Sequence, residues 1–223
     1  TQYISITGVQ PLPLVEGFQS LPFLPINWLM YNPNNDETWQ RSATVGGYGT
    51  STACAYFNNY SVDVTGTRDA MYTPKYDFSG LTSATLTFDV AYARYDATYS
   101  DTLAVYVSTD CGATFTQVYL KGGTTLATAP DNTTSGFVST NTQWRTETVS
   151  LNSYLGQSKV MLSFENRSRY GQYLYVDNIN ISGVGGAAPV AAFTASVTTV
   201  CAGSAITFTD QSTGNPTSWS WAF

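Results

Sequence analysis

The stretch YLYVDNINIS, residues 173–182, predicts a β-strand. Tyr173, Tyr175 and the run from Val176 to Ile181 carry aromatic and β-branched side chains, which suit a pleated and half-buried surface. Asp177 interrupts this pattern, although aspartate is depleted in strands and is rarely buried without a partner. The stretch therefore predicts a strand and, with Asp177, marks a first candidate functional residue.

The same alternation of apolar and polar residues recurs upstream. It covers residues 84–95, 101–110, 115–123, 144–151 and 159–168, with turn signals such as Cys111-Gly112 and Tyr170-Gly171 between the segments. Many short alternating strands with regular turns predict an all-β fold, an antiparallel sandwich or jelly roll. No long helical period is present, and we expect at most a short helical turn near LNSYLGQ, residues 151–157.

A composition change divides the chain. The stretch SGVGGAAPVAAF, residues 182–193, is small, uncharged and rich in glycine and alanine, as linkers are. We predict an N-terminal extension over 1–13, a jelly-roll domain over 14–182, a linker over 183–190 and part of a second sandwich over 191–223. The last segment is too short to build a stable sandwich alone.

The composition excludes several classes of function. The net charge is −6 and the nine Lys and Arg are scattered, so nucleic-acid binding has no electrostatic footprint. No apolar run reaches the length of a membrane-spanning helix. The chain has no histidine, which excludes Ser-His-Asp and Cys-His catalysis within it and histidine-ligated zinc. Few charged residues and many Thr, Ser, Asn and Gln are typical of secreted all-β proteins.

The three cysteines show no metal-binding spacing. In a secreted protein two of them can pair. Cys54 and Cys111 share the larger domain, so we predict a disulfide between them, with Cys201 left free or paired outside this chain.

The tail resembles the start of a PKD domain, an immunoglobulin-like β-sandwich. The matching residues are Pro189, Ala192-Phe193, the run CAGSAITFTDQSTGNPTSWSW over 201–221, and Phe223. Ala222 stands where the family usually has aspartate. The resemblance implies a truncated second β-sandwich, of a kind that usually serves as an extracellular spacer. Strands are expected over 205–212 and from 217.

The larger domain resembles the MAM-like, cleaved-adhesin-like jelly rolls of secreted Bacteroidetes proteins. The resemblance is carried by LVEGFQSLPFLPINWLMYNP (14–33), RDAMYTPKYDFSG (68–80), residues 86–128 and YGQYLYVDNINI (170–181). This version is similar to the segment that follows the catalytic domain of pappalysin-type zinc metalloproteases. The resemblance implies a secreted or cell-surface module and calcium bound near the matching acidic residues.

Three acidic residues match that family pattern, namely Glu16, Asp101 and Asp177. The first and last strands of a jelly roll commonly lie side by side, so we expect Glu16 near Asp177. Carboxylates brought together repel unless a cation or protons neutralise them, and Ca²⁺ takes six to eight oxygen ligands. Further oxygens can come from Asn58, Asn59 or Asp69 in the polar segment 57–69. The alternative is that each acid is exposed or bound by backbone N–H groups.

A catalytic alternative uses paired carboxylates, as glycosidases do. The candidates are Asp89, Glu147 and Glu165, which lie on predicted strands. They can instead face solvent or pair with arginines such as Arg94 and Arg167.

The segment YARYDATYSD, residues 92–101, is the candidate ligand surface, with Tyr92, Arg94, Tyr95 and Tyr99 as binding residues. Aromatic rings with a polar tip can stack on sugars or fill protein interfaces. The alternative is that these tyrosines cover the edge of the sandwich. Trp28 and Trp39 are expected in the core.

These patterns together predict a non-catalytic binding module of a secreted or cell-surface bacterial protein. Its expected partner is a polysaccharide or an extracellular protein, and its expected cofactor is structural Ca²⁺. One alternative is a structural part of an adhesin or filament that acts through homo-assembly. The other is an intrinsic glycan hydrolase.

Overall fold

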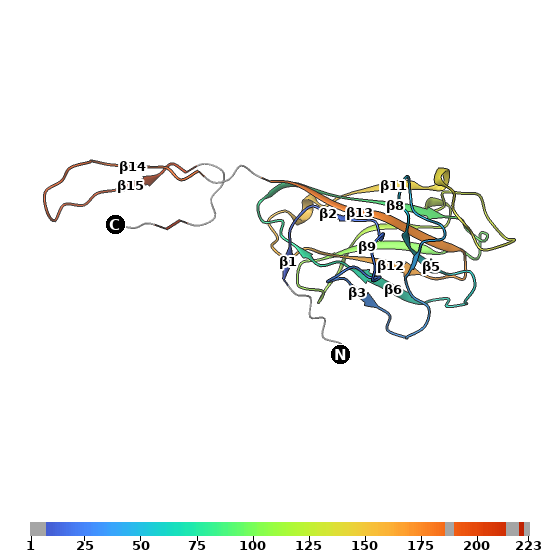
Figure 1. The fold of residues 1–223 in the computed structure, drawn as a ribbon. Helices are drawn as coiled ribbons and strands as arrows, with labels where there is room; N and C mark the ends of the chain where they lie inside the picture. Colours follow the sequence, from blue (N-terminus) through green and yellow to red (C-terminus); the bar gives the residue numbers. More distant parts are fainter. Residues whose placement is uncertain (1–7, 186–189, 213–218, 221–223) are drawn as a thin grey trace. The chain divides into compact units, whose positions relative to one another are not determined.

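The computed structural model of the chain describes residues 8–185, 190–212 and 219–220 (Figure 1). The chain divides into two compact units, Thr1–Gly183 and Val184–Phe223. Every helix in the described residues is a three-residue turn, so none could cross a membrane.

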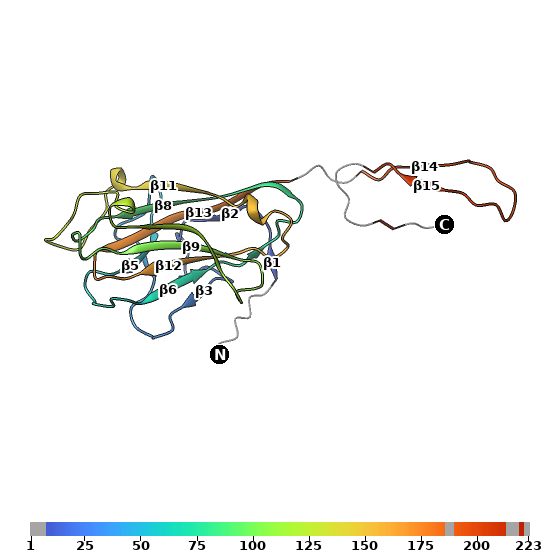
Figure 2. The same ribbon diagram turned by 180° about the vertical axis from the view of Figure 1, so that it is seen from behind.

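Two stacked β-sheets form the larger unit, as Figures 1 and 2 show. Among the described residues, one sheet has the strand order β10-β9-β12-β6-β3. Its strands are β3 (Leu29–Tyr31), β6 (Arg68–Tyr72), β9 (Thr102–Ser108), β10 (Thr116–Gly122) and β12 (Met161–Arg167). Each neighbouring pair in this sheet is antiparallel.

The other sheet has the order β11-β8-β13-β5-β4, and β2 also pairs with β13. Its strands are β2 (Leu14–Glu16), β4 (Gln40–Ser42), β5 (Cys54–Asn58), β8 (Leu81–Tyr92), β11 (Arg145–Ser150) and β13 (Tyr173–Gly185). A short parallel pair joins β1 (Val9–Gln10) to β7 (Lys75–Tyr76).

The predicted jelly-roll sandwich is confirmed, and six segments predicted as strands each contain one. The predicted helical turn is present at Asn152–Tyr154. The last strand differs from expectation, because β13 continues through Gly185 into the segment assigned to a linker. The pairing of the first and last strands is as expected, with Glu16 of β2 opposite Ile179 of β13.

The hydrophobic core lies between the two sheets. Phe88 of β8 and Phe164 of β12 meet edge to face across it, with ring centroids 5.4 Å apart. Trp28 and Trp39 are buried, as predicted. Alternate residues of each strand thus face the neighbouring sheet, which is the arrangement that the period of two predicts.

Within residues 190–212 of the smaller unit, β14 (Phe193–Ala195) pairs with β15 (Phe208–Asp210) in antiparallel fashion. The rings of Phe193 and Phe208 are 5.7 Å apart. β15 lies within the predicted strand over 205–212, whereas most of the predicted strand from residue 217 lies outside the described residues. The PKD assignment of this unit therefore stays a prediction.

Asp101 is a buried carboxylate that holds two loops together. Its Oδ1 accepts hydrogen bonds from the backbone N–H groups of Arg169 (2.8 Å) and Gly171 (3.2 Å). Its Oδ2 accepts from the N–H of Gln172 (2.9 Å) and the hydroxyl of Tyr92 (3.0 Å). Burial raises the pKa of Asp101, and these hydrogen bonds oppose that rise.

We expect the substitution Asp101→Asn to destabilise the domain by about 2–4 kcal/mol, because an amide NH₂ would face groups that are themselves donors. Urea unfolding measures the change as a lower midpoint at constant slope. Asp63→Asn is the control, since Asp63 is exposed and accepts a local hydrogen bond from the N–H of Thr65. Equal stability of the two variants would contradict the assigned role of Asp101.

Candidate functional site

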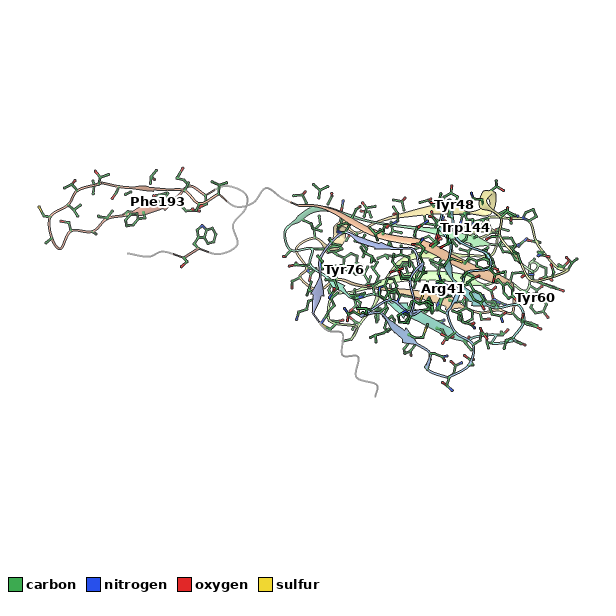
Figure 3. All side chains as sticks on the ribbon, viewed as in Figure 1. Arg41, Tyr48, Tyr60, Tyr76, Trp144 and Phe193 are labelled. Atoms are coloured by element: carbon green, nitrogen blue, oxygen red, sulfur yellow. The ribbon has the colours of Figure 1, made fainter. Side chains whose placement is uncertain are left out.

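A pocket of about 420 Å³ is lined by four tyrosines, namely Tyr60, Tyr95, Tyr99 and Tyr170. They come from three separate loops, which follow β5, follow β8 and join β12 to β13. Tyr99 and Tyr170 keep 44% and 39% of their surface exposed, so a ligand can reach their rings. Figure 3 shows Tyr60 at one end of the larger unit.

The rings of the pocket touch in sequence. Ring centroids are 6.4 Å apart for Tyr60 and Tyr95, 6.1 Å for Tyr95 and Tyr99, and 6.2 Å for Tyr99 and Tyr170. From Tyr60 the contacts continue through Tyr173, Tyr175 and Trp144 to Tyr48. We call this series the aromatic ribbon; Figure 3 labels Tyr48 and Trp144, which lie beside each other.

The loop that carries Tyr95 and Tyr99 is ordered by Asp96. Its Oδ1 accepts the N–H groups of Thr98 (2.7 Å) and Tyr99 (2.8 Å), which closes a tight polar turn. A backbone turn fixed in this way reduces the entropy that the loop would lose on binding a ligand. The part of the pocket that Tyr95 and Tyr99 form is therefore held by an ordered turn.

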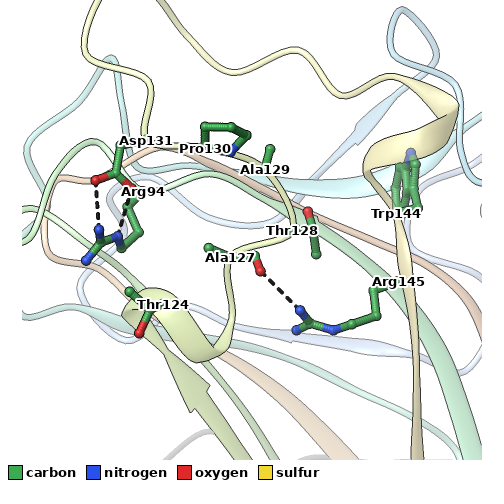
Figure 4. A pocket seen from close by; sticks show the side chains of 9 residues that line it. All are labelled: Arg94, Thr124, Ala127, Thr128, Ala129, Pro130, Asp131, Trp144 and Arg145. Atoms are coloured by element: carbon green, nitrogen blue, oxygen red, sulfur yellow. Dashed lines mark hydrogen bonds and ion pairs between the residues drawn. The ribbon is translucent and has the colours of Figure 1, made fainter.

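A second, more open pocket of about 600 Å³ lies beside Arg94, Trp144 and Arg145 (Figure 4). Arg94 is held by a bidentate ion pair with Asp131, at 2.8 and 2.7 Å. The guanidinium of Arg145 donates to Glu147 and to three backbone carbonyls, one of them that of Ala127. Both guanidinium groups already have partners within the protein, so this pocket is the weaker candidate for a ligand site.

The structure separates the four predicted ligand residues. Tyr95 and Tyr99 line the tyrosine pocket, whereas Arg94 lines the second pocket. Tyr92 is fully buried, and its hydroxyl is bound to Asp101, so its assignment to a binding surface is wrong. Tyr60 was not predicted to contribute, because only the fold brings the loop after β5 to the loop after β8.

The five predicted metal ligands do not lie together. Asp101 is bound by residues 169–172, ahead of β13, whereas Asp177 lies within that strand and Asp69 belongs to the opposite sheet. Asn58, at the end of β5, accepts the N–H of Ser61. Asp101 does not fit a calcium site, since donors already occupy both of its oxygens.

Glu16 and Asp177 lie on paired strands, and burial raises the pKa of both carboxyls, that of Asp177 to about 6. Asp177 accepts the N–H groups of Tyr48 (2.9 Å) and Asn178 (2.8 Å). A side chain at Gly47 would place its Cβ 1.9 Å from Asp177 Oδ2, so glycine is needed there. These amides hold Asp177 directly, and calcium at this pair stays a prediction.

The acids of the catalytic alternative are each bound to a different partner. Glu147 forms ion pairs with Lys121 (2.6 Å) and Arg145 (2.7 Å). Glu165 pairs with Arg167 (2.8 Å), as the sequence suggested, and Asp89 accepts from Thr146 and Asn178. Within the described residues no three acidic, cysteine or histidine side chains gather at one point. The geometry gives no acid and base facing a common cleft.

The predicted disulfide between Cys54 and Cys111 is wrong. Cys54 is buried on β5, whereas Cys111 is exposed in the turn after β9, and both are free thiols. Burial, with the nearby charge of Asp177, raises the pKa of the Cys54 thiol far above its usual range. Sharing a domain does not bring two cysteines within bonding distance.

Solved structures with a similar fold include three adhesin domains. The K1 cleaved adhesin domain of Lys-gingipain from Porphyromonas gingivalis W83 has a TM-score of 0.57 and 23% identity, covering 78% of this chain and 99% of that domain. The K3 domain from the same organism has a TM-score of 0.54 and 20% identity, with coverage of 76% and 98%. The K2 domain gives 0.52 and 18%, with coverage of 77% and 99%.

At these identities the likeness concerns the fold. The resemblance to cleaved-adhesin jelly rolls is confirmed at that level, whereas the MAM-like assignment stays a prediction. No protein-family model matches the chain, and no curated protein matches it.

We expect two of the three thiols to react with a disulfide reagent in the native protein, and the third only after denaturation. Cys111 and Cys201 are exposed, whereas Cys54 is buried and its thiolate is strongly disfavoured. Titration with Ellman's reagent before and after adding guanidinium measures this. A single reactive thiol both before and after adding guanidinium would contradict this expectation and support a disulfide between Cys54 and Cys111.

Proposed function

We propose that the chain is a non-catalytic binding module of a secreted or cell-surface bacterial protein, and that it binds a polysaccharide through the tyrosine pocket. The observation that carries the proposal is the pocket itself, whose lining consists of the side chains of Tyr60, Tyr95, Tyr99 and Tyr170. Its volume of about 420 Å³ is in the range of small-ligand sites and suits a few sugar units.

The chemistry of the lining favours a neutral sugar over a charged ligand. None of the four lining residues is charged at neutral pH, and the net charge of the chain is −6, which disfavours anions. A phenol ring offers an apolar face for the C–H groups of a sugar, and its hydroxyl can exchange hydrogen bonds with sugar hydroxyls. Of the other rings in the aromatic ribbon, Tyr48 is exposed and Tyr173 is half-buried, whereas Tyr175 and Trp144 are buried and serve as support.

The second candidate function is docking of an extracellular protein or another copy of the chain. The K1, K2 and K3 domains with a similar fold are adhesin domains, which supports this candidate and an extracellular location equally. Exposed tyrosines are also frequent anchors of protein interfaces. Inhibition of binding by free oligosaccharide separates the two, because a protein partner would be unaffected.

The resemblance to MAM-like and PKD modules supports placing this chain in a larger secreted protein, in which it assists a metalloprotease. The complete open reading frame tests that placement. A HExxHxxGxxH stretch upstream supports it, since that motif supplies the zinc ligands and base of such proteases. A reading frame without a catalytic domain would instead favour an adhesin.

We expect Tyr99→Ala and Tyr170→Ala each to weaken polysaccharide binding by about ten-fold, because each removes a stacking surface worth roughly 1.4 kcal/mol. Affinity electrophoresis in gels that contain a panel of neutral plant, algal and bacterial polysaccharides measures the change.

Tyr31→Ala is the matched control. Tyr31 is 42% exposed but does not line the tyrosine pocket. It lies on β3, at the edge of the five-stranded sheet, where it stacks on Tyr72. Retention of the wild-type protein by none of the polymers would reject the sugar-binding proposal. If Tyr31→Ala weakened binding as much as Tyr99→Ala and Tyr170→Ala, the tyrosine pocket would not be the binding site.

A further inference from the structure

Among the described residues, the three most exposed large apolar side chains line a single pocket. Val15, Leu21 and Ile26 are 74%, 77% and 81% exposed, and they surround a hollow of about 390 Å³ beside β2. Exposed apolar side chains are ordinary when they are scattered, whereas a group of them in one place marks an interaction surface. We call these three residues the apolar rim.

The loop between β2 and β3, which carries two residues of the apolar rim, has a fixed support. Its Phe18 and Trp28 are buried, and their rings meet edge to face with centroids 6.0 Å apart. The guanidinium of Arg41, on β4, donates to the backbone carbonyls of Phe18 (2.6 Å) and Gln19 (2.9 Å). The loop is therefore anchored to the core and to a neighbouring strand, and the folded chain holds the rim in solvent.

The outer face of the six-stranded sheet adjoins the apolar rim. Val15 of the rim lies opposite Asn180 of β13, and Asn178 lines the same pocket. On β8 and β11 the side chains of Leu86 and Val149 belong to the core, so those of the residues on either side of them point outward. We call the outward-facing residues the uncharged face, and they are Asn178, Asn180, Thr85, Thr87, Thr148 and Ser150.

The uncharged face contrasts with the net charge of the chain, which is −6. Asp89 points to the same side, but it is only 5% exposed and its carboxylate accepts hydrogen bonds from Thr146 and Asn178. Glu16, which lines the pocket of the apolar rim, accepts the N–H of Phe18. Two copies of the chain repel each other through their net charge, and this repulsion is weakest where the approaching surfaces carry no exposed charge.

Both parts of this surface are complementary to themselves. Hydroxyl and amide groups donate and accept hydrogen bonds, so two copies of the uncharged face can bond to each other, which two faces of like charge cannot do. At the apolar rim, Leu21 and Ile26 project beside the hollow that they line, so the projecting side chains of one copy meet a receiving hollow on the other. A two-fold contact requires both matching features on one surface.

We propose that the apolar rim and the uncharged face form a two-fold interface with a second copy of this chain. The interface lies away from the tyrosine pocket along β8, because Thr85 and Thr87 belong to its first half whereas Tyr95 and Tyr99 follow its end. A dimer of this kind leaves both tyrosine pockets open, and two linked sites bind a polymer that spans them more tightly than one site does. Dimerisation itself does not depend on the proposed sugar binding.

Sedimentation equilibrium of the full chain, in a reducing buffer that excludes links through the exposed cysteines, measures the dimerisation. Ile26→Asp and Thr148→Glu each place one negative charge in the interface, the first in the apolar rim and the second on the uncharged face. The matched controls Val138→Asp and Thr133→Glu add the same charge at exposed positions outside it. We expect the wild type and both controls to dimerise with a Kd in the micromolar range, and each interface variant to dimerise at least about ten-fold more weakly, because its added charge loses solvent in the contact.

Tyr170→Ala separates this interface from association through the tyrosine pocket, and we expect it to dimerise as the wild type does. The interface variants change exposed side chains on separate elements, so both should keep the melting temperature of the wild type, and a folding defect in one leaves the other to decide. A wild type that stays monomeric throughout the micromolar range would overturn the proposal. So would undiminished dimerisation of Ile26→Asp and Thr148→Glu, loss of dimerisation in Tyr170→Ala alone, or growth beyond the dimer, which a closed two-fold contact excludes.

Discussion

The carboxylate of Asp101 holds the end of the sandwich at which the tyrosine pocket lies. It binds the amides of residues 169, 171 and 172, and Tyr170 belongs to that loop. The hydroxyl of Tyr92 donates to Asp101 Oδ2 and accepts the N–H of Asp101, so residues 92 and 101 close the loop that carries Tyr95 and Tyr99. Three of the four pocket residues therefore depend on one buried side chain.

Other buried polar groups extend this support into the longest connection of the larger unit. The side chain of Gln172 accepts the N–H of Phe137 and donates to the carbonyls of Asn132 and Ser135. Asn59 and Asn166 exchange hydrogen bonds between the two sheets, at 3.2 and 2.9 Å. Loops that carry binding residues need such rigid support, and here buried amides supply it where the apolar core ends.

Alternation along the chain predicted most of the fold, because the period of two is local and each strand has one buried face. Residues 84–95 and 144–151 could be assigned in this way. The pairing of the first and last strands followed from the jelly-roll topology. The pocket could be predicted only in part, because Tyr60 reaches Tyr95 through tertiary structure alone. The Cys54–Cys111 prediction failed for the same reason, since the sequence does not give the distance between a strand and a turn far along the chain.

The sequence also could not distinguish the buried aspartates, because a carboxylate bound by amides and one bound by a cation interrupt a strand pattern in the same way. The hydrogen bonds do distinguish them. Asp101 has four donors, Asp177 has two backbone amides, and Asp69 has no donor of normal geometry. Because each donor offsets part of the cost of burying a carboxylate, Asp101 is the most fully compensated of the three and Asp69 the least.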